Sequence, residues 1–226
     1  MSIHMSISIF SKISPIKVID ASIHISDYIP IDISKENKEL LTFDIASSTE
    51  WEIYLERYLK KNNAKVAYGG YLETRDIYNR STHFDDGIQR NIHLGIDLWT
   101  NSDTKVLAAL EGTIHSLHNN ANYGDYGPTI IIKHSIDSFT FYTLYGHLSL
   151  KSLVNVKVGE RIKQGDVIGY LGSSSVNGDY APHLHFQLII DIANYHGDYP
   201  GVCAVNELDF FKENCPDPNL LLKINL

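Results

Sequence analysis

The chain has 226 residues, of which 43% are hydrophobic, and a formal net charge of −8 at pH 7. This length is enough to bury a full core as one globular domain, or as one domain with an appendage. The acidic balance and the absence of a Lys/Arg cluster argue against nucleic acid as a partner, because a binding face must neutralise phosphates. No run approaches the roughly 18 apolar residues of a membrane span, so no transmembrane segment is expected.

The first forty or so residues carry short Ile-rich pieces in which apolar and polar residues partly alternate. This pattern predicts weak strands or an extended arm that packs on the main body and is interrupted at Pro30. The start of the chain lacks the basic segment and the uninterrupted apolar segment of a secretory signal. We therefore expect a cytoplasmic location.

The segment 47–63, SSTEWEIYLERYLKKNN, is the clearest predicted helix. Ser47 and Glu50 have the spacing of a capping box, and lysines at the far end favour the negative end of the helix dipole. Its apolar residues recur at the spacing of one helix face, which we interpret as a core face. They are Trp51, Tyr54, Leu55, Tyr58 and Leu59.

Between residues 105 and 191, five segments rich in β-branched and aromatic residues are separated by Gly or Asn clusters at hairpin distances. They predict a β-rich core. His134 ends one of these segments and is expected to be a hydrogen-bonded histidine, not a metal ligand. Beyond the strands we predict a short helix over roughly residues 206–214 and an extended tail after Pro218. Cys203 and Cys215 are interpreted as free thiols, as in a reducing compartment.

Five residues in three separate motifs indicate a metal site. In APHLHFQLII, His183 and His185 project from the same face of a predicted strand. RNIHLGIDLW supplies His93 and Asp97, and FYTLYGHLSL supplies His147. Catalytic zinc takes three protein ligands and leaves a fourth position for water. The five residues are therefore enough for a His-Asp-His triad with two uncoordinated histidines beside it.

These motifs, in this order, resemble the signature of the lysostaphin and LytM type zinc endopeptidases. The resemblance covers residues 91–190 and implies one Zn²⁺ per chain, held by His93, Asp97 and His185. It also implies that His147 and His183 stay off the metal and act on the substrate or the attacking water. Gln187 departs from the glutamate usual in the family, which puts the contacts around the site in doubt more than metal binding.

The resemblance further implies a mainly β fold, an antiparallel sandwich or half-barrel of the LytM type. We add to it an N-terminal arm with one amphipathic helix over 1–65, and a peptidase domain over 66–226 that ends with the short helix. The glycine pattern of residues 154–172 resembles the half-barrel of biotinyl and lipoyl carrier domains, and we interpret it as scaffold. The glycine-rich segment 123–128 is expected to be a hairpin lining the substrate groove.

The function implied is hydrolysis of a peptide bond, in a peptidoglycan cross-bridge or a Gly-containing peptide, by zinc-activated water. Three further residues are candidates for substrate contacts: Arg75 and Arg80 as forks for a carboxylate, and Tyr145 as an oxyanion donor or, equally, a core residue. Family members often act outside the cytoplasm, which conflicts with the location expected here. The alternatives are a cytosolic zinc amidase acting on a small peptide-like molecule, and a non-hydrolytic binding or regulatory module.

Overall fold

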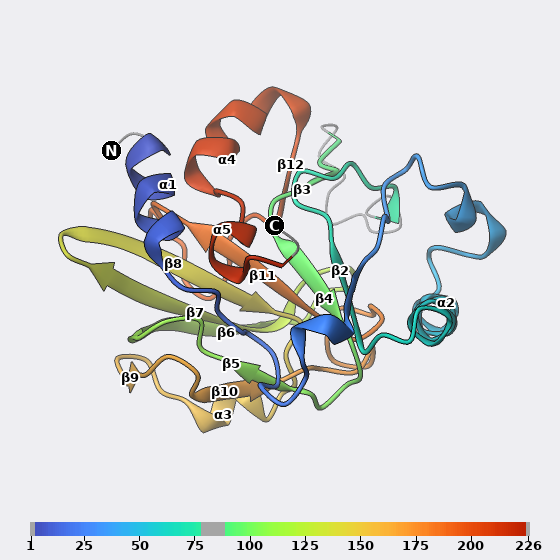
Figure 1. Cartoon of the computed structure of the whole chain (residues 1–226), viewed down its shortest axis with the longest axis horizontal. Helices are drawn as coiled ribbons and strands as arrows, with labels where there is room; N and C mark the ends of the chain where they lie inside the picture. The colour runs from blue at the N-terminus through green and yellow to red at the C-terminus, as the bar shows by residue number, and fades with distance from the viewer. Residues whose placement is uncertain (1–2, 78–88, 225–226) are drawn as a thin grey trace.

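The computed structural model describes residues 3–77 and 89–224 of the chain. One large mixed sheet dominates this part, with eight strands in the order β1-β2-β4-β11-β8-β7-β6-β9 (Figure 1). Its neighbours pair antiparallel except β1 and β2, which are parallel. The strands are Tyr28–Pro30 (β1), Val66–Gly69 (β2), Ile96–Trp99 (β4), Gly112–Asn120 (β6), Gly127–Ile136 (β7), Phe139–Gly146 (β8), Arg161–Ile162 (β9) and His183–Ile189 (β11).

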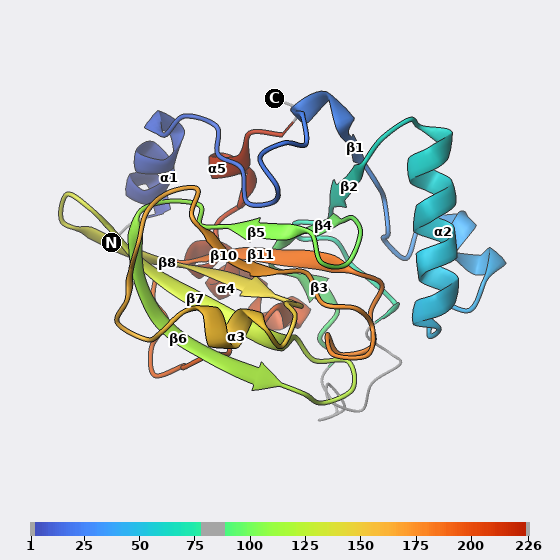
Figure 2. The same ribbon diagram turned by 90° about the horizontal axis from the view of Figure 1, so that it is seen from below.

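Smaller elements surround this sheet (Figure 2). Two further two-stranded sheets pair β5 (Lys105–Leu107) with β10 (Val167–Tyr170), and β3 (Ile92–His93) with β12 (Val202–Cys203). The helices are α1 (Ile3–Lys12), α2 (Ser48–Lys61), α3 (Ser152–Asn155), α4 (Leu208–Asn214) and α5 (Asn219–Leu222), with 3-10 turns η1 (Ile25–Asp27), η2 (Lys38–Thr42) and η5 (Val205–Glu207). None of the helices in the described ranges has the length and apolar character needed to cross a bilayer. The prediction of a mainly β fold is confirmed.

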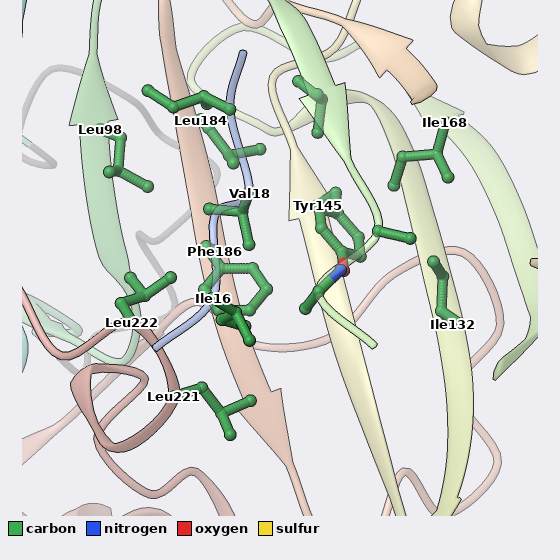
Figure 3. Packing of buried hydrophobic residues seen from close by; sticks show 14 of the residues in the cluster. Ile16, Val18, Leu98, Ile132, Tyr145, Ile168, Leu184, Phe186, Leu221 and Leu222 are labelled. Carbon is green, nitrogen blue, oxygen red and sulfur yellow. The ribbon is translucent and has the colours of Figure 1, made fainter. Parts of the chain in front are cut away.

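The main hydrophobic core lies between the large sheet and the segments that cover it (Figure 3). Leu184 and Phe186 of β11 are fully buried there, and Ile168 of β10 covers the same cluster. Both ends of the chain also contribute, since Val18 and Leu221 are buried in this cluster. The N-terminal and C-terminal segments therefore close one core together.

Two terminal segments differ from the prediction. The start of the chain, expected to be strands or an extended arm, forms α1, and β1 is the one strand among residues 3–40. The Phe10 ring packs on Phe139 and Phe141 of β8, with ring centroids 5.9 and 4.9 Å apart. The Ile and Ser alternation favours a strand locally, but burial of an aromatic anchor overrides such weak propensities. The tail after Pro218, expected to be extended, forms the helical turn α5.

Helix α2 confirms the predicted helix and most of its details. Ser47 is the N-cap, and its hydroxyl accepts a hydrogen bond from the Glu50 amide at 3.3 Å. The other half of the capping box is replaced, because the Glu50 carboxylate accepts from the Asp44 amide at 2.7 Å. Trp51 and Leu55 are buried against the main body, as the apolar spacing predicts. The division of the chain at residue 65 stays a prediction.

The two edges of the large sheet are short. β1 has three residues and ends at Pro30, while β9 has two residues. β1 comes from the predicted arm and pairs with β2 through Tyr28↔Val66, Ile29↔Ala67 and Pro30↔Tyr68. This parallel pair makes the sheet mixed, where a purely antiparallel one was expected.

Phe10 tests whether α1 is part of the folded core. Its side chain is 0% exposed, so Phe10→Ala should lower the free energy of unfolding by about 3–5 kcal/mol, through lost burial and a residual cavity. Urea denaturation measures this change. Leu41→Ala, at a side chain that is 84% exposed, is the matched control and should change stability by less than about 0.5 kcal/mol. Equal values for the two variants would show that α1 does not belong to the core.

His134 of β7 is a buried neutral histidine. Its Nδ1 donates to the Glu111 carbonyl at 2.8 Å, and its Nε2 lies 2.7 Å from the Thr143 hydroxyl. Burial lowers the pKa of His134 from 6.5 to about 4. These contacts confirm the expectation that His134 is a hydrogen-bonded histidine.

This depressed pKa predicts a loss of stability in acid. The neutral ring is favoured only in the folded state, so its contribution is complete above pH 6.5 and falls as the pH drops toward 4. Between pH 7 and pH 4.5 the loss from this group should be roughly 2–3 kcal/mol. Urea denaturation at both pH values should therefore show a smaller acid loss for His134→Gln than for the wild type. His118→Gln, at an exposed histidine, should keep the wild-type dependence.

Candidate metal centre and cavity

The site is built around β11, which lies between β4 and β8 in the large sheet. Its register places His185 opposite Asp97 of β4 and opposite Gly146 of β8. Directly opposed residues on paired strands project from the same face. Gly95 makes room for this arrangement, because a side chain there would come within 2.6 Å of the His185 ring. His93, from β3, completes the group.

His93, Asp97 and His185 converge on one point. Asp97 Oδ1 lies 3.2 Å from His93 Nε2 and 3.1 Å from His185 Nδ1, and the two nitrogens are 2.9 Å apart. The three side chains are at most 3% exposed. Two imidazole nitrogens and one carboxylate oxygen at these distances form a donor set that suits a single zinc ion.

Hydrogen bonds on the outer side of each ring fix where its proton is. His93 Nδ1 donates to the Gly70 carbonyl at 3.0 Å, and His185 Nε2 donates to the Gln187 side-chain oxygen at 2.9 Å. The two nitrogens that face each other therefore carry lone pairs, not protons. Two lone pairs and a carboxylate oxygen that converge in a buried site favour a cation between them. The residues present thus fit a bound metal ion.

The charge states of the group agree with this arrangement. Burial, and then the Arg75 charge, lower the pKa of His93 from 6.5 to about 3, so its ring is neutral at pH 7. Burial alone would raise the pKa of Asp97, but His93 and Arg75 outweigh it and hold that pKa well below its ordinary value. Neutral imidazole and ionised carboxylate are the forms that bind a metal ion.

His147 and His183 form a second pair beside the first group. Their Nδ1 atoms donate to the carbonyls of Asn177, at 2.8 Å, and Ala181, at 2.7 Å. Their ring centroids are 4.2 Å apart, and His183 Nε2 lies 4.0 Å from Asp97 Oδ1. Burial lowers the pKa of both rings, so both are neutral and present an unprotonated Nε2. Each is therefore placed to accept a proton.

Tyr145 lies on the opposite face of the sheet from the site. It is fully buried in the main core beside Phe186 (Figure 3), and its hydroxyl accepts a hydrogen bond from the Ala109 amide at 2.8 Å. A role as an oxyanion donor beside His147 would need both side chains on one face of a continuous strand. β8 ends at Gly146, and His147 has a φ of 61°, so the alternation of faces is broken between them. Of the two alternatives for Tyr145, the structure shows the core position.

The two arginines proposed as substrate contacts have different outcomes. Arg75 is 2% exposed, and its guanidinium contacts Asp97 and Glu73 of the chain itself. A role of Arg75 in holding a substrate carboxylate stays a prediction, whereas the contacts observed are with carboxylates of the chain itself. Arg80 lies outside the described residues.

A cavity of about 330 Å³ opens over both groups. Gly124, Asp125 and Tyr126 line it, as expected of the segment 123–128. Other wall residues include Trp51 from α2 and Tyr199 from the segment before β12. The candidate ligands and the second histidine pair thus face one shared space.

Tyr126 belongs to the segment expected to line the groove, but the sequence did not indicate its contact with the site histidines. Its hydroxyl lies 3.4 Å from His185 Nε2, and its ring lies 5.6 Å from that of His147, centroid to centroid. Two glycines make room for the ring, because a side chain at Gly146 or Gly201 would overlap it. No local pattern marks this contact, since the glycines that make room for the Tyr126 ring are distant in sequence.

Gln187 places a neutral amide at the position where the family usually has a glutamate. Its oxygen accepts from His185, while its nitrogen donates to the Pro200 carbonyl at 3.1 Å and to Cys215 Sγ at 3.2 Å. The amide therefore keeps the acceptor that fixes the His185 proton. Cys203 and Cys215 are buried free thiols, as expected.

Comparison with known proteins agrees with this geometry. Residues 91–196 match the model of Peptidase family M23. Endolysin 2638A of Staphylococcus phage 2638A is 30% identical over 58% of this chain and 27% of its own length. Glycyl-glycine endopeptidase ALE-1 of Staphylococcus capitis is 38% identical over 45% of this chain and 25% of its own length. Peptidoglycan DD-endopeptidase ShyC of Vibrio cholerae serotype O1 is 36% identical over 46% of this chain and 21% of its own length.

The chain thus spans 27% or less of the length of these relatives. The matched region contains all five residues of the histidine and aspartate motifs. The resemblance stated from those motifs is confirmed, since residues 91–196 match the model of Peptidase family M23 and lysostaphin is among the relatives.

Proposed function

We propose that this chain is a zinc-dependent metallopeptidase that hydrolyses a peptide bond in peptidoglycan or in a peptide derived from it. The observation that carries the proposal is the convergence of three unprotonated donor atoms in a buried site, next to two further neutral histidines. A structural metal site has no need of two free bases beside it, whereas hydrolysis does. The family match of the same region supports the same reaction class.

Each polar residue of the site has a role in this proposal. His93, Asp97 and His185 hold the zinc, which when bound supplies a Lewis acid that activates water and polarises the scissile carbonyl. His147 and His183 each present Nε2 toward the cavity, because their Nδ1 protons are held by main-chain carbonyls. One takes the proton of the attacking water and the pair delivers a proton to the leaving amine.

The buried position of these histidines also sets their proton affinity. Burial lowers the pKa of His147 and His183, so both enter the reaction unprotonated at neutral pH. The protonated ring formed during the reaction is stabilised by the Asp97 charge, since His183 Nε2 lies 4.0 Å from its carboxylate. His183 and Asp97 are buried, which strengthens such charge interactions.

The substrate class is proposed from the relatives. One is named as a glycyl-glycine endopeptidase and another as a peptidoglycan DD-endopeptidase, so both names describe cleavage of a peptide bond. Zinc amidase activity on a small peptide-like molecule is the alternative, and it differs in the product released. The cytoplasmic location expected from the start of the sequence stays a prediction.

The division of roles between the two groups of residues is testable through metal content. His93→Ala, Asp97→Ala and His185→Ala should each lose zinc, because each removes one of three ligands. His147→Ala and His183→Ala should keep about one zinc per chain, because these side chains lie off the metal. Metal analysis after dialysis measures this, with His118→Ala as a control outside the cavity. Equal zinc loss in all five variants would contradict the assignment.

The reaction itself is testable with purified protein. Peptidoglycan fragments and glycine-rich peptides should be cleaved, a chelator should stop cleavage, and added zinc should restore it. His147→Ala should lower kcat/KM by about 10²–10⁴-fold, the usual contribution of a general base. Mass spectrometry of the products identifies the bond. A zinc-loaded protein that releases only small amide products from peptide-like molecules would instead favour the amidase.

A further inference from the structure

We infer that Arg75 is a positioning residue of the metal centre, which turns the Asp97 carboxylate so that only Oδ1 faces the two histidines. This inference rests on the proposed function, because it concerns the same zinc site. It assigns a role to a residue that precedes the family match at 91–196 and that the sequence motifs placed among substrate contacts.

The two oxygens of Asp97 have different partners. Oδ2 accepts a hydrogen bond from the Arg75 guanidinium at 2.5 Å, while Oδ1 lies 3.2 Å from His93 Nε2. A carboxylate held by one oxygen cannot rotate to exchange the two. The Arg75 contact therefore leaves Oδ1 as the ligand atom.

Arg75 is itself held in place. Its Nε donates to Glu73 Oε2 at 2.7 Å, and Glu73 Oε1 accepts from the Ile33 amide at 3.1 Å. Arg75 is 2% exposed, so the pair lies in a region where such charge-assisted bonds are strong. The planar guanidinium spans Glu73 and Asp97 with two different nitrogens, which a lysine could not do.

The turn before Arg75 contacts a second ligand. Gly70 has a φ of 103°, and its carbonyl accepts from His93 Nδ1 at 3.0 Å. A side chain at Gly70 would overlap the Arg75 guanidinium, so glycine is required there for two reasons. The segment 70–75 thus orients His93 and Asp97 together, and the pairing of Gly69 with Asp97 brings it to the site.

Charge and orientation make opposite predictions for zinc affinity. If Arg75 acted only through its charge, removing this positive charge would strengthen the attraction between the Asp97 carboxylate and zinc. Zinc binding would then become tighter. If it acts by orienting the ligand, removing it should weaken binding by about 10–100-fold, as for other outer contacts of metal ligands. The direction of the change therefore tells the two roles apart.

The test is the zinc affinity of Arg75→Met, measured by competition with a chromophoric chelator at pH 7.5. We expect weaker binding by about 10–100-fold, and a changed visible spectrum of the cobalt-loaded protein. Arg90→Met is the matched control, because Arg90 also lines the cavity but lies near Glu207, at 3.9 Å. It should leave zinc affinity unchanged.

A second variant separates positioning from folding. Arg75→Met leaves the Glu73 carboxylate without this cation, which can destabilise the protein. Adding Glu73→Gln removes that charge and keeps the oxygen that accepts from Ile33. The double variant should regain stability, followed by circular dichroism, while its zinc affinity stays low. If zinc affinity returns together with stability, Arg75 has only a structural role and the inference is wrong.

The failure of this inference is distinct from failure of the proposed function. A wild-type protein that binds zinc, with Arg75→Met binding it equally or more tightly, overturns the positioning role alone. A wild-type protein that binds no zinc overturns both. Neither readout requires a known substrate.

Discussion

The pairing of β11 between β4 and β8 is the constraint on which the site depends. In this register, His183 and His185 face the cavity while Leu184 and Phe186 enter the core. A slip by one residue would exchange the two sets, burying imidazoles among apolar side chains and exposing leucine and phenylalanine. The hydrophobic core therefore also fixes the candidate metal centre, because the burial of one face determines what the other face presents.

Around this frame, the position of each proton is set by a fixed acceptor. Three of the four site histidines donate to main-chain carbonyls, and His185 donates to the Gln187 amide oxygen. Main-chain acceptors do not titrate or rotate, so the unprotonated nitrogens stay aimed at the same space. The site is thus organised before anything binds, which reduces the reorganisation that binding and reaction require.

The sequence predicts the chemistry of the site better than its surroundings. Four of the five motif residues lie on strands, where spacing can translate directly into a shared face, as it does for His183 and His185. The failures have physical causes. Spacing left two positions open for Tyr145, because no spacing rule contains the positive φ with which His147 leaves the strand. Gly70 and Arg75 were not recognised as outer contacts, since such contacts join residues distant in sequence. α1 depends on the packing of Phe10 against Phe141, whereas the local alternation of Ile and Ser favours a strand.

The short edges of the large sheet bear on how the protein behaves at high concentration. A sheet of eight strands would ordinarily offer two long rows of unpaired amides and carbonyls to a neighbouring molecule. At one border β1 is three residues long and closes with Pro30, so it gives an incoming strand few main-chain partners. At the other, β9 pairs only with Gly112 and Thr113 of β6, so in the described part of the chain the rest of β6 has no strand beside it on that side. The wide sheet that carries the site is thus protected from strand addition at its β1 border.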